Sequence, residues 1–144
     1  MQKIIYFSNW LYIHKVPILP RLLMNINRLI FACSVSYKTK IGKGLKLGHG
    51  GLGVVIHQDA IIGENCKIGT SVTIGGSKKN PIVPIIGNNV YIATGAKVIG
   101  QVIIGNNVVI AANSVVVSDV PDNCLVAGLP GRIIKRNIDI NEYV

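Results

Sequence analysis

Three histidines are the side chains of this sequence best suited to acid–base chemistry. An imidazole has an unperturbed pKa of about 6.5, so it can take up and return a proton near neutral pH. His49 is followed by Gly50 and Gly51, which would let a substrate approach the backbone closely. His57 follows eight residues after His49, and His14 lies in the N-terminal region. His49 is therefore a candidate base, with a loop cap as its alternative role. Gly50, Gly51 and His57 are candidate substrate contacts, and the alternative for His57 is a surface residue at a corner of the fold.

Zinc chemistry and cysteine chemistry are not indicated. A catalytic zinc site needs three protein ligands, and His49 and His57 have no third histidine in the part of the chain that follows His14. The three cysteines are an odd number without metal-type spacing. We expect no metal, and we expect Cys33, Cys66 and Cys124 to be reduced thiols that act as small hydrophobic residues in a cytoplasmic protein.

Length and composition fit one folded domain. Of the 144 residues, 49% are hydrophobic and only 15% are charged, which excludes intrinsic disorder. No apolar stretch reaches the roughly 18 residues of a transmembrane helix, and we expect no cleavable signal peptide. The net charge of +9 is uneven, because residues 1–58 carry eight basic side chains and no acidic one. These basic residues are mixed with Leu, Ile and Trp in no recognisable nucleic-acid-binding motif, so we expect no nucleic-acid partner.

A six-residue repeat organises the chain from Ile41 onward. Nine of the eleven steps between its aliphatic residues are six residues long, and these residues are Ile41, Leu47, Ile56, Ile62, Ile68, Ile74, Ile86, Ile92, Val98, Ile104, Ile110 and Val116. The two longer steps contain insertions of three residues before Ile56 and of six residues before Ile86. The next residue is glycine in seven of the twelve cases, as expected where the chain needs positive φ or a close backbone approach. A helix cannot produce this period, whereas short strands joined by tight turns can.

The hexapeptide pattern resembles the left-handed parallel β-helix acyltransferases. In that fold three hexapeptides form one triangular coil, so twelve predict four coils with the aliphatic side chains along the axis. At about 4.8 Å per coil, the prism would be roughly 19 Å tall. We expect an all-β solenoid over residues 38–131, a helical cap over residues 1–37 and a C-terminal tail over residues 132–144.

Residues 1–37 are predicted to form two short helices. Proline is tolerated in a first helical turn and disfavoured inside a helix, so the first should end before Pro17 and the second should begin near Pro20. One expected role is to cover the open end of the prism, whose first coil would otherwise expose strand edges. The other role is a peripheral contact with the inner face of a membrane, because Trp10 and the all-basic charge suit an anionic surface. The two roles can coexist.

Three runs, residues 47–76, 86–100 and 119–134, narrow the resemblance to the short serine O-acetyltransferase group. Relatives of that group also acetylate sugars during surface-polysaccharide assembly. The resemblance implies acetyl-CoA as the donor, direct transfer to a hydroxyl, and His49 as the catalytic base that deprotonates this hydroxyl. It also implies a homotrimer in which coenzyme A lies in the groove between two prisms.

We expect coenzyme A to contact three sets of residues. The glycine-rich loop resembles the cofactor loop of the group and comprises Gly75, Gly76, Ser77 and Lys78. Small turn residues would let the pantetheine arm pass, although plain turn sterics explains them equally well; these are Ala93, Gly95, Ala111 and Ala112. The basic residues Arg132 and Lys135 would bind phosphates through charge-assisted hydrogen bonds, or remain solvated.

The residues that hold the amino acid in serine-specific members are missing here. Two aspartates of those members correspond to Gly48 and Ser34, and an Arg-His pair falls near Ile82 and Val83. We therefore expect the acceptor to be a sugar hydroxyl of a surface polysaccharide (lipopolysaccharide or capsule), with L-serine as the alternative. A catalytically silent scaffold is the non-enzyme alternative, which the retained His49 corner disfavours.

Valine-rich faces agree with the expected homotrimer. A groove between prisms needs two neighbouring copies. Flat faces bearing Val54, Val55, Val102, Val108 and Val109 would expose a large apolar patch in a monomer.

Overall fold

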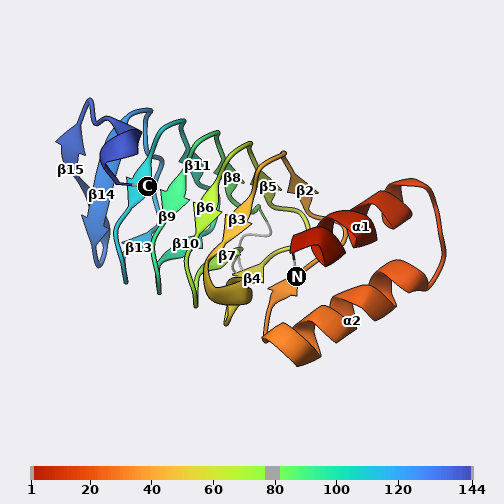
Figure 1. The fold of residues 1–144 in the computed structure, drawn as a ribbon. Coiled ribbons are helices and arrows are strands. Elements are labelled where there is room, and N and C mark those ends of the chain that lie inside the picture. Colours follow the sequence, from red (N-terminus) through yellow and green to blue (C-terminus); the bar gives the residue numbers. More distant parts are fainter. Residues whose placement is uncertain (1, 77–81, 144) are drawn as a thin grey trace.

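The chain folds into two helices followed by a stack of short strands (Figure 1). A computed structural model describes residues 2–76 and 82–143. The helices are α1 (Gln2–Ile13) and α2 (Leu19–Phe31), and two 3₁₀ turns are η1 (Gly48–Gly51) and η2 (Ile140–Glu142). The strands are β1 (Ser34–Val35), β2 (Lys40–Ile41), β3 (Lys46–Leu47), β4 (Val55–Ile56), β5 (Ile61–Ile62), β6 (Lys67–Ile68), β7 (Thr73–Gly75), β8 (Ile85–Ile86), β9 (Tyr91–Ile92), β10 (Lys97–Ile99), β11 (Ile103–Ile104), β12 (Val109–Ile110), β13 (Val115–Val116), β14 (Cys124–Gly128) and β15 (Gly131–Arg136).

Successive strands enter three parallel sheets in turn, so every three strands complete one coil. The first sheet has the order β1-β4-β7-β10-β13, and the second has the order β2-β5-β8-β11. The third sheet has the order β3-β6-β9-β12-β14, and β15 joins its end as an antiparallel strand. The left-handed parallel β-helix predicted from the repeat, with about four turns, is confirmed.

The repeat aliphatics form the core of the prism. Eleven of the twelve are buried, and Ile41 at the N-terminal end is half-buried against them. The strand register stacks the repeat aliphatics of successive coils on one another; for example, Ile62 pairs with Ile41 on one side and with Ile86 on the other. The stack begins one hexapeptide earlier than the predicted boundary at residue 38, since Val35 is buried and pairs with Ile56. At the other end, β15 continues past residue 131.

Glycines after the aliphatics are explained by close backbone approach. A Cβ on Gly87 would lie 2.7 Å from the carbonyl oxygen of Gly105 in the next coil, and a Cβ on Gly42 would lie 2.6 Å from the carbonyl carbon of Gly63. The left-handed conformation occurs two residues later instead, at Gly44, Asn65, Asn89, Asn107 and Asn123. Five of the seven glycines are therefore explained by the spacing between coils, namely Gly42, Gly63, Gly69, Gly87 and Gly105, whereas Gly48 and Gly75 have no such close contact with described residues.

The valine faces expected to support a trimer were placed wrongly. Val54, Val102, Val108 and Val109 are buried, and only Val55 is exposed. For Val54, Val102 and Val108 the error arises because the residue two positions before each aliphatic also points inward, as strand alternation requires. Val109, which directly precedes Ile110, is buried as well. The exposed apolar face lies on the second sheet, where three isoleucines stack in register: Ile61, Ile85 and Ile103, with 36%, 44% and 54% exposure.

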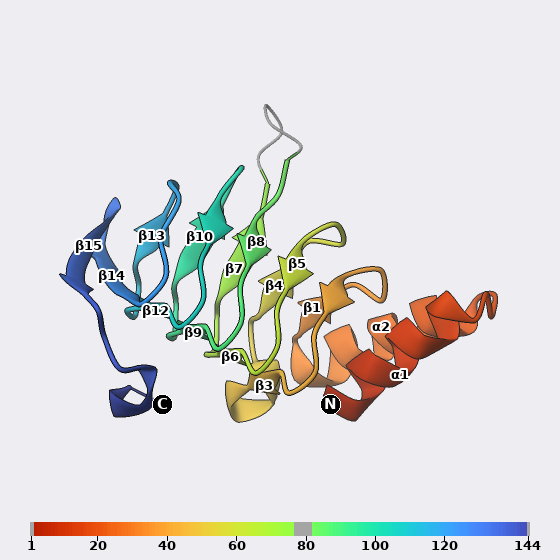
Figure 2. The same cartoon turned by 90° about the horizontal axis from the view of Figure 1, so that it is seen from above.

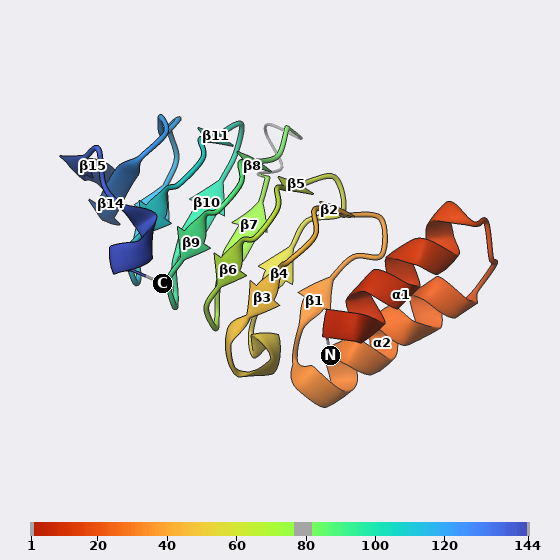
Figure 3. The same ribbon diagram turned by 45° about the horizontal axis from the view of Figure 1, so that its top comes forward.

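The two helices lie beside the first coil (Figure 3). As predicted, α1 ends before Pro17, and α2 begins at Leu19 with Pro20 in its first turn. The hydroxyl of Tyr6 donates to the carbonyl of Gly42 at 2.7 Å and accepts from the amide of Leu45 at 3.1 Å. Within the described ranges, no helix is both long and apolar enough to cross a membrane. The contact with an anionic membrane surface stays a prediction.

Replacing Gly87 by alanine should weaken the stack, because the new Cβ would press on rigid backbone of the next coil. We expect a loss of about 1–3 kcal/mol of unfolding free energy, the usual cost of overpacking. Urea denaturation followed by circular dichroism measures it. The matched control is Gly75→Ala, whose Cβ would meet no atom within 4 Å among the described residues beyond its chain neighbours. Equal urea midpoints for the two variants would contradict the explanation.

Candidate functional site

His49 lies where the repeat is interrupted. The three-residue insertion after β3 forms η1, which projects from the edge between the third and first sheets (Figure 2). His49 has left-handed backbone angles, φ 44° and ψ 43°, and Gly50 and Gly51 continue with φ of 69° and 68°. A left-handed conformation is uncommon for a residue with a Cβ and is maintained only by its surroundings. The imidazole is thereby held outside the prism, on an exposed turn.

The turn that carries His49 is fixed at its base by backbone hydrogen bonds. The amide of Val54 donates to the carbonyl of Gly51 at 2.9 Å, and the amide of Ser71 in the next coil donates to the carbonyl of Leu52 at 2.8 Å. On the other side, the amide of Gly53 donates to Ala32, directly after α2, at 3.0 Å. Helix α2 and the second coil therefore both position the turn.

A groove of about 390 Å³ opens beside His49 on the outward face of the third sheet. Its lining comes from β3, β6, β9, the turns that follow them, and one C-terminal residue: Lys46, Leu47, Gly48, His49, Lys67, Ile68, Gly69, Thr70, Tyr91, Thr94 and Tyr143. Turns η1 and η2 stand on the same side of the prism as these strands (Figure 2). Within residues 2–76 and 82–143, the His49 ring has no hydrogen bond or ion pair, so it is available to a substrate proton.

Some of the predicted cofactor residues share an edge with His49. We name the row of turns after the third-sheet strands the His49 edge; it runs from η1 past Ala93 and Gly95 to Ala111 and Ala112. Its coils are joined by backbone bonds, such as the amide of Ala93 donating to Ile110 at 2.9 Å. Small residues thus follow one another along this edge from His49 toward the C-terminal coils, as the passage of a pantetheine arm would require.

Other predicted residues lie on a different edge. We name the row of turns after the first-sheet strands the Gly75 edge; it carries Gly75, Gly76 and His57. One protomer therefore does not bring these residues to His49. The predicted loop residues Ser77 and Lys78 lie outside the described residues.

Comparison with known proteins gives this arrangement a family. The family described as bacterial transferase hexapeptide (six repeats) matches residues 84–118. A serine acetyltransferase of Synechococcus elongatus is 43% identical over 132 residues, which make up 90% of this chain and 54% of that protein. A solved Brucella abortus serine acetyltransferase in complex with coenzyme A has a TM-score of 0.87 at 33% identity, covering 94% of this chain and 55% of its own. A Neisseria gonorrhoeae serine acetyltransferase in complex with serine has a TM-score of 0.84 at 34% identity, covering 92% and 54%.

This chain is a member of the hexapeptide-repeat acyltransferase family. Within the family it is similar to the serine acetyltransferases, which confirms the resemblance seen in the sequence. The hexapeptide-repeat chain spans about half the length of the relatives that it matches.

His57 and His14 have local partners away from the groove of this hexapeptide-repeat protein. The Nδ1 atom of His57 accepts from the amide of Asp59 at 3.2 Å and lies 3.6 Å from the Asp59 carboxylate. The ring of His14 lies 4.1 Å from the ring of Trp10, and its Nδ1 is 2.8 Å from the Trp10 carbonyl oxygen. His49 is therefore the histidine that the fold places in a groove.

The predicted basic residues lie on β15. Arg132 pairs in register with Ala127, at the far end of the His49 edge, and donates to the carbonyl of Gly131 at 3.3 Å. Lys135 lies opposite Leu125 and forms an exposed ion pair with Glu142 at 3.8 Å. Arg132 is thus better placed than Lys135 for a ligand that runs along this edge.

Cysteine nucleophiles are not available at the groove. Cys33, Cys66 and Cys124 are all buried and unpaired. Burial raises the pKa of the Cys33 thiol to about 11 and also raises the pKa of the Cys66 thiol. A thiol that keeps its proton at neutral pH is a poor nucleophile, so these two residues act as core side chains. Among the described residues, no three His, Cys, Asp or Glu side chains could together hold a metal ion.

The groove also contains residues that the sequence analysis did not select. Lys46, Lys67 and Tyr91 each precede a repeat aliphatic, so strand alternation turns them outward on one face. Their position in the hexapeptide could have identified them. Tyr143 reaches the groove from the C-terminal segment, for which the repeat offers no signal.

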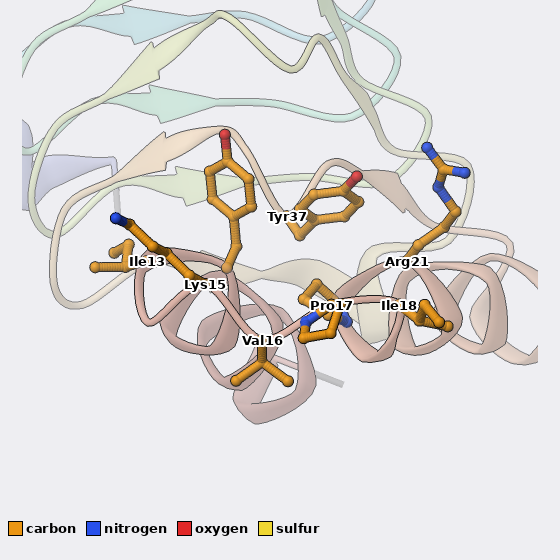
Figure 4. A pocket seen from close by; sticks show the side chains of 9 residues that line it. Ile13, Lys15, Val16, Pro17, Ile18, Arg21 and Tyr37 are labelled. Atoms are coloured by element: carbon orange, nitrogen blue, oxygen red, sulfur yellow. The ribbon is translucent and has the colours of Figure 1, made fainter.

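A larger cavity of about 630 Å³ lies at the far end of the helical hairpin (Figure 4). Lys15 and Arg21 flank Tyr37 there, beside Pro17 and Ile18. None of its lining residues is a His, Asp, Glu or Cys. The cavity therefore carries no side chain that would serve as a base near neutral pH.

Proposed function

We propose that the chain transfers an acetyl group from acetyl-CoA to a hydroxyl acceptor, with His49 as the general base. The observation that carries this proposal is the His49 imidazole, which has no hydrogen bond or ion pair among the described residues and is held by a fixed turn at the mouth of a groove. The names of the relatives support it, since they are serine acetyltransferases, one of them in complex with coenzyme A.

The reaction is a direct transfer. His49 takes the proton from the acceptor hydroxyl as its oxygen attacks the thioester carbonyl carbon. The tetrahedral intermediate collapses by breaking the carbon–sulfur bond, and the imidazolium returns its proton to the departing thiolate of coenzyme A. No acyl-enzyme is needed, in keeping with the burial of all three cysteines.

L-serine is the better supported acceptor. The relatives are named for it, and one solved structure is a complex with serine. This support outweighs the sugar hydroxyl that the sequence analysis favoured. The sugar remains the second candidate because of one observation: among the described residues, the groove lining contains no acidic side chain to hold the ammonium of an amino acid.

A homotrimer would complete the site. In one protomer, the His49 edge and the Gly75 edge bound opposite sides of the first sheet. Prisms packed side by side would set the Gly75 edge of one copy near the His49 edge of its neighbour, with coenzyme A between them. The isoleucine face of Ile61, Ile85 and Ile103 is the apolar surface that such packing would bury.

Release of free coenzyme A tests the activity and its acceptor. We expect saturable turnover of acetyl-CoA with L-serine. The same assay with nucleotide-linked and lipid-linked sugars tests the second candidate, and turnover restricted to a sugar would replace serine as the acceptor. Absence of release with every acceptor, for a protein that is folded by circular dichroism, would contradict the proposed function.

Replacing His49 by alanine should lower the turnover number by about 10²- to 10⁴-fold, the usual contribution of a general base. The melting temperature should hardly change, because the side chain is exposed and holds no core volume. His57→Ala is the matched control and should keep most of the activity. Turnover retained by His49→Ala, or an equal loss in both variants, would refute the assignment.

The trimer predicts a mass near three times 15.5 kDa at micromolar concentration. Ile85→Glu should shift it to the monomer, because a charge in the centre of the isoleucine face would be buried without a partner. Size-exclusion chromatography with light scattering measures both. Ile134→Glu, an exposed isoleucine on β15, is the control. A monomeric parent protein would contradict the trimer.

A further inference from the structure

Two lysines stand side by side on the wall of the His49 groove. Lys46 on β3 pairs in register with Lys67 on β6, and Lys67 pairs with Tyr91 on β9. Adjacent strands lie about 4.8 Å apart, so both ammonium groups reach the same part of the groove. Lys46 precedes His49 by only three residues. The pair is thus part of the wall that faces the proposed base.

Neither lysine has an ion-pair partner among the described residues. Like charges in register on neighbouring strands repel each other and destabilise a sheet. The two ion pairs found in the described ranges involve other residues, namely His57 with Asp59 and Lys135 with Glu142. Within residues 2–76 and 82–143, no Asp or Glu side chain lines the groove.

Another outward-facing lysine is used differently. Lys97, on the first sheet, donates from Nζ to the carbonyls of Ser71 at 2.6 Å and Gly95 at 3.0 Å, and so has a structural role. No hydrogen bond is found for the ammonium groups of Lys46 and Lys67 in residues 2–76 and 82–143.

The rest of the wall offers hydroxyl groups. Thr70, Thr94, Tyr91 and Tyr143 line the same groove, with the two threonine hydroxyls 3.4 Å apart. Two cations with several hydroxyl donors match a group with several acceptor oxygens and negative charge. We propose that Lys46 and Lys67 bind the anionic group, carboxylate or phosphate, of the acceptor whose hydroxyl faces His49. This inference rests on the proposed function and deepens it, because both candidate acceptors can meet it: L-serine through its carboxylate, and a sugar through a linking phosphate.

The phosphates of coenzyme A are a poorer match for this pair. In coenzyme A the thioester and the phosphates stand at opposite ends of the pantetheine arm. A phosphate held one strand away from His49 would keep the thioester far from the base. The anion at Lys46 must therefore belong to a molecule whose hydroxyl lies close to its charge, which describes the acceptor.

Steady-state kinetics of Lys46→Met and Lys67→Met test the assignment. The matched control is Lys40→Met, an exposed lysine on the second sheet of the same coil. Each acceptor is compared with a partner that lacks the anion: L-serine with L-serine amide, and a sugar 1-phosphate with the free sugar. Loss of a charge-assisted contact should lower kcat/KM for the anionic acceptor about 10- to 100-fold. The partner that lacks the anion should show no such loss, and the KM of acetyl-CoA should be unchanged.

Three outcomes would overturn the inference. One is an equal loss for acceptors with and without the anionic group, and another is an equal loss in Lys40→Met. The third is a raised KM for acetyl-CoA with unchanged acceptor kinetics, which would assign the lysines to the cofactor. The serine and sugar arms show which source supplies the anion.

A binding measurement separates this inference from the proposed function. Calorimetric titration with L-serine and with inorganic phosphate needs no turnover. Binding that is lost in Lys67→Met and kept in Lys40→Met supports the anion site even if no acetyl transfer is found. Normal transfer with no binding difference between the two variants rejects the site and leaves the proposed function intact. Melting temperatures establish that all variants are folded.

Discussion

The spacing between coils is the constraint on which this structure depends. Each strand has only two or three residues in most coils, so it cannot exist without the strands above and below. Backbone hydrogen bonds between coils hold the stack, and the coils approach so closely that Gly63 and Gly87 cannot carry a Cβ. A residue's place in its hexapeptide then decides whether it enters the core, forms a turn or faces outward.

Functional side chains can be placed on such a fold only where the close spacing between coils is interrupted or where the outward face of a sheet is exposed. The insertion after Leu47 interrupts this spacing, because extra residues need not stack and can leave the prism. His49 stands there, while hydrogen bonds from Gly53 to Ala32 and from Ser71 to Leu52 hold the C-terminal end of the insertion. The open face is the outward side of the third sheet at β3, β6 and β9, where Lys46, Lys67 and Tyr91 line the groove. The proposed base, His49, thus comes from an insertion into the repeat, whereas the wall of its groove comes from an open face of a regular sheet.

Most of the prism could be predicted from the sequence, because one period determines both strand pairing and burial. The period placed Ile62 and Ile74 in the core and marked the insertion that carries His49. It failed for the valines, since Val54 and Val102 follow the same alternation inward as their neighbours. Small turn residues alone do not distinguish the His49 edge from the Gly75 edge; the edges differ because every third hexapeptide shares a sheet, which places Ala93 and Gly75 on different edges. Tyr143 was beyond prediction, since its place depends on how a segment without repeats crosses the third sheet.

The His49 edge has a further consequence: it measures length in fixed increments. From His49 in the first coil to Ala127 beside Arg132, the edge climbs four coils, each adding about 4.8 Å. Side-chain substitutions cannot adjust this span, since only the gain or loss of a whole coil changes it. The distance along the edge is thus fixed by the number of coils between His49 and Arg132. This distance sets how long an extended ligand must be to contact Arg132 at one end and the His49 imidazole at the other.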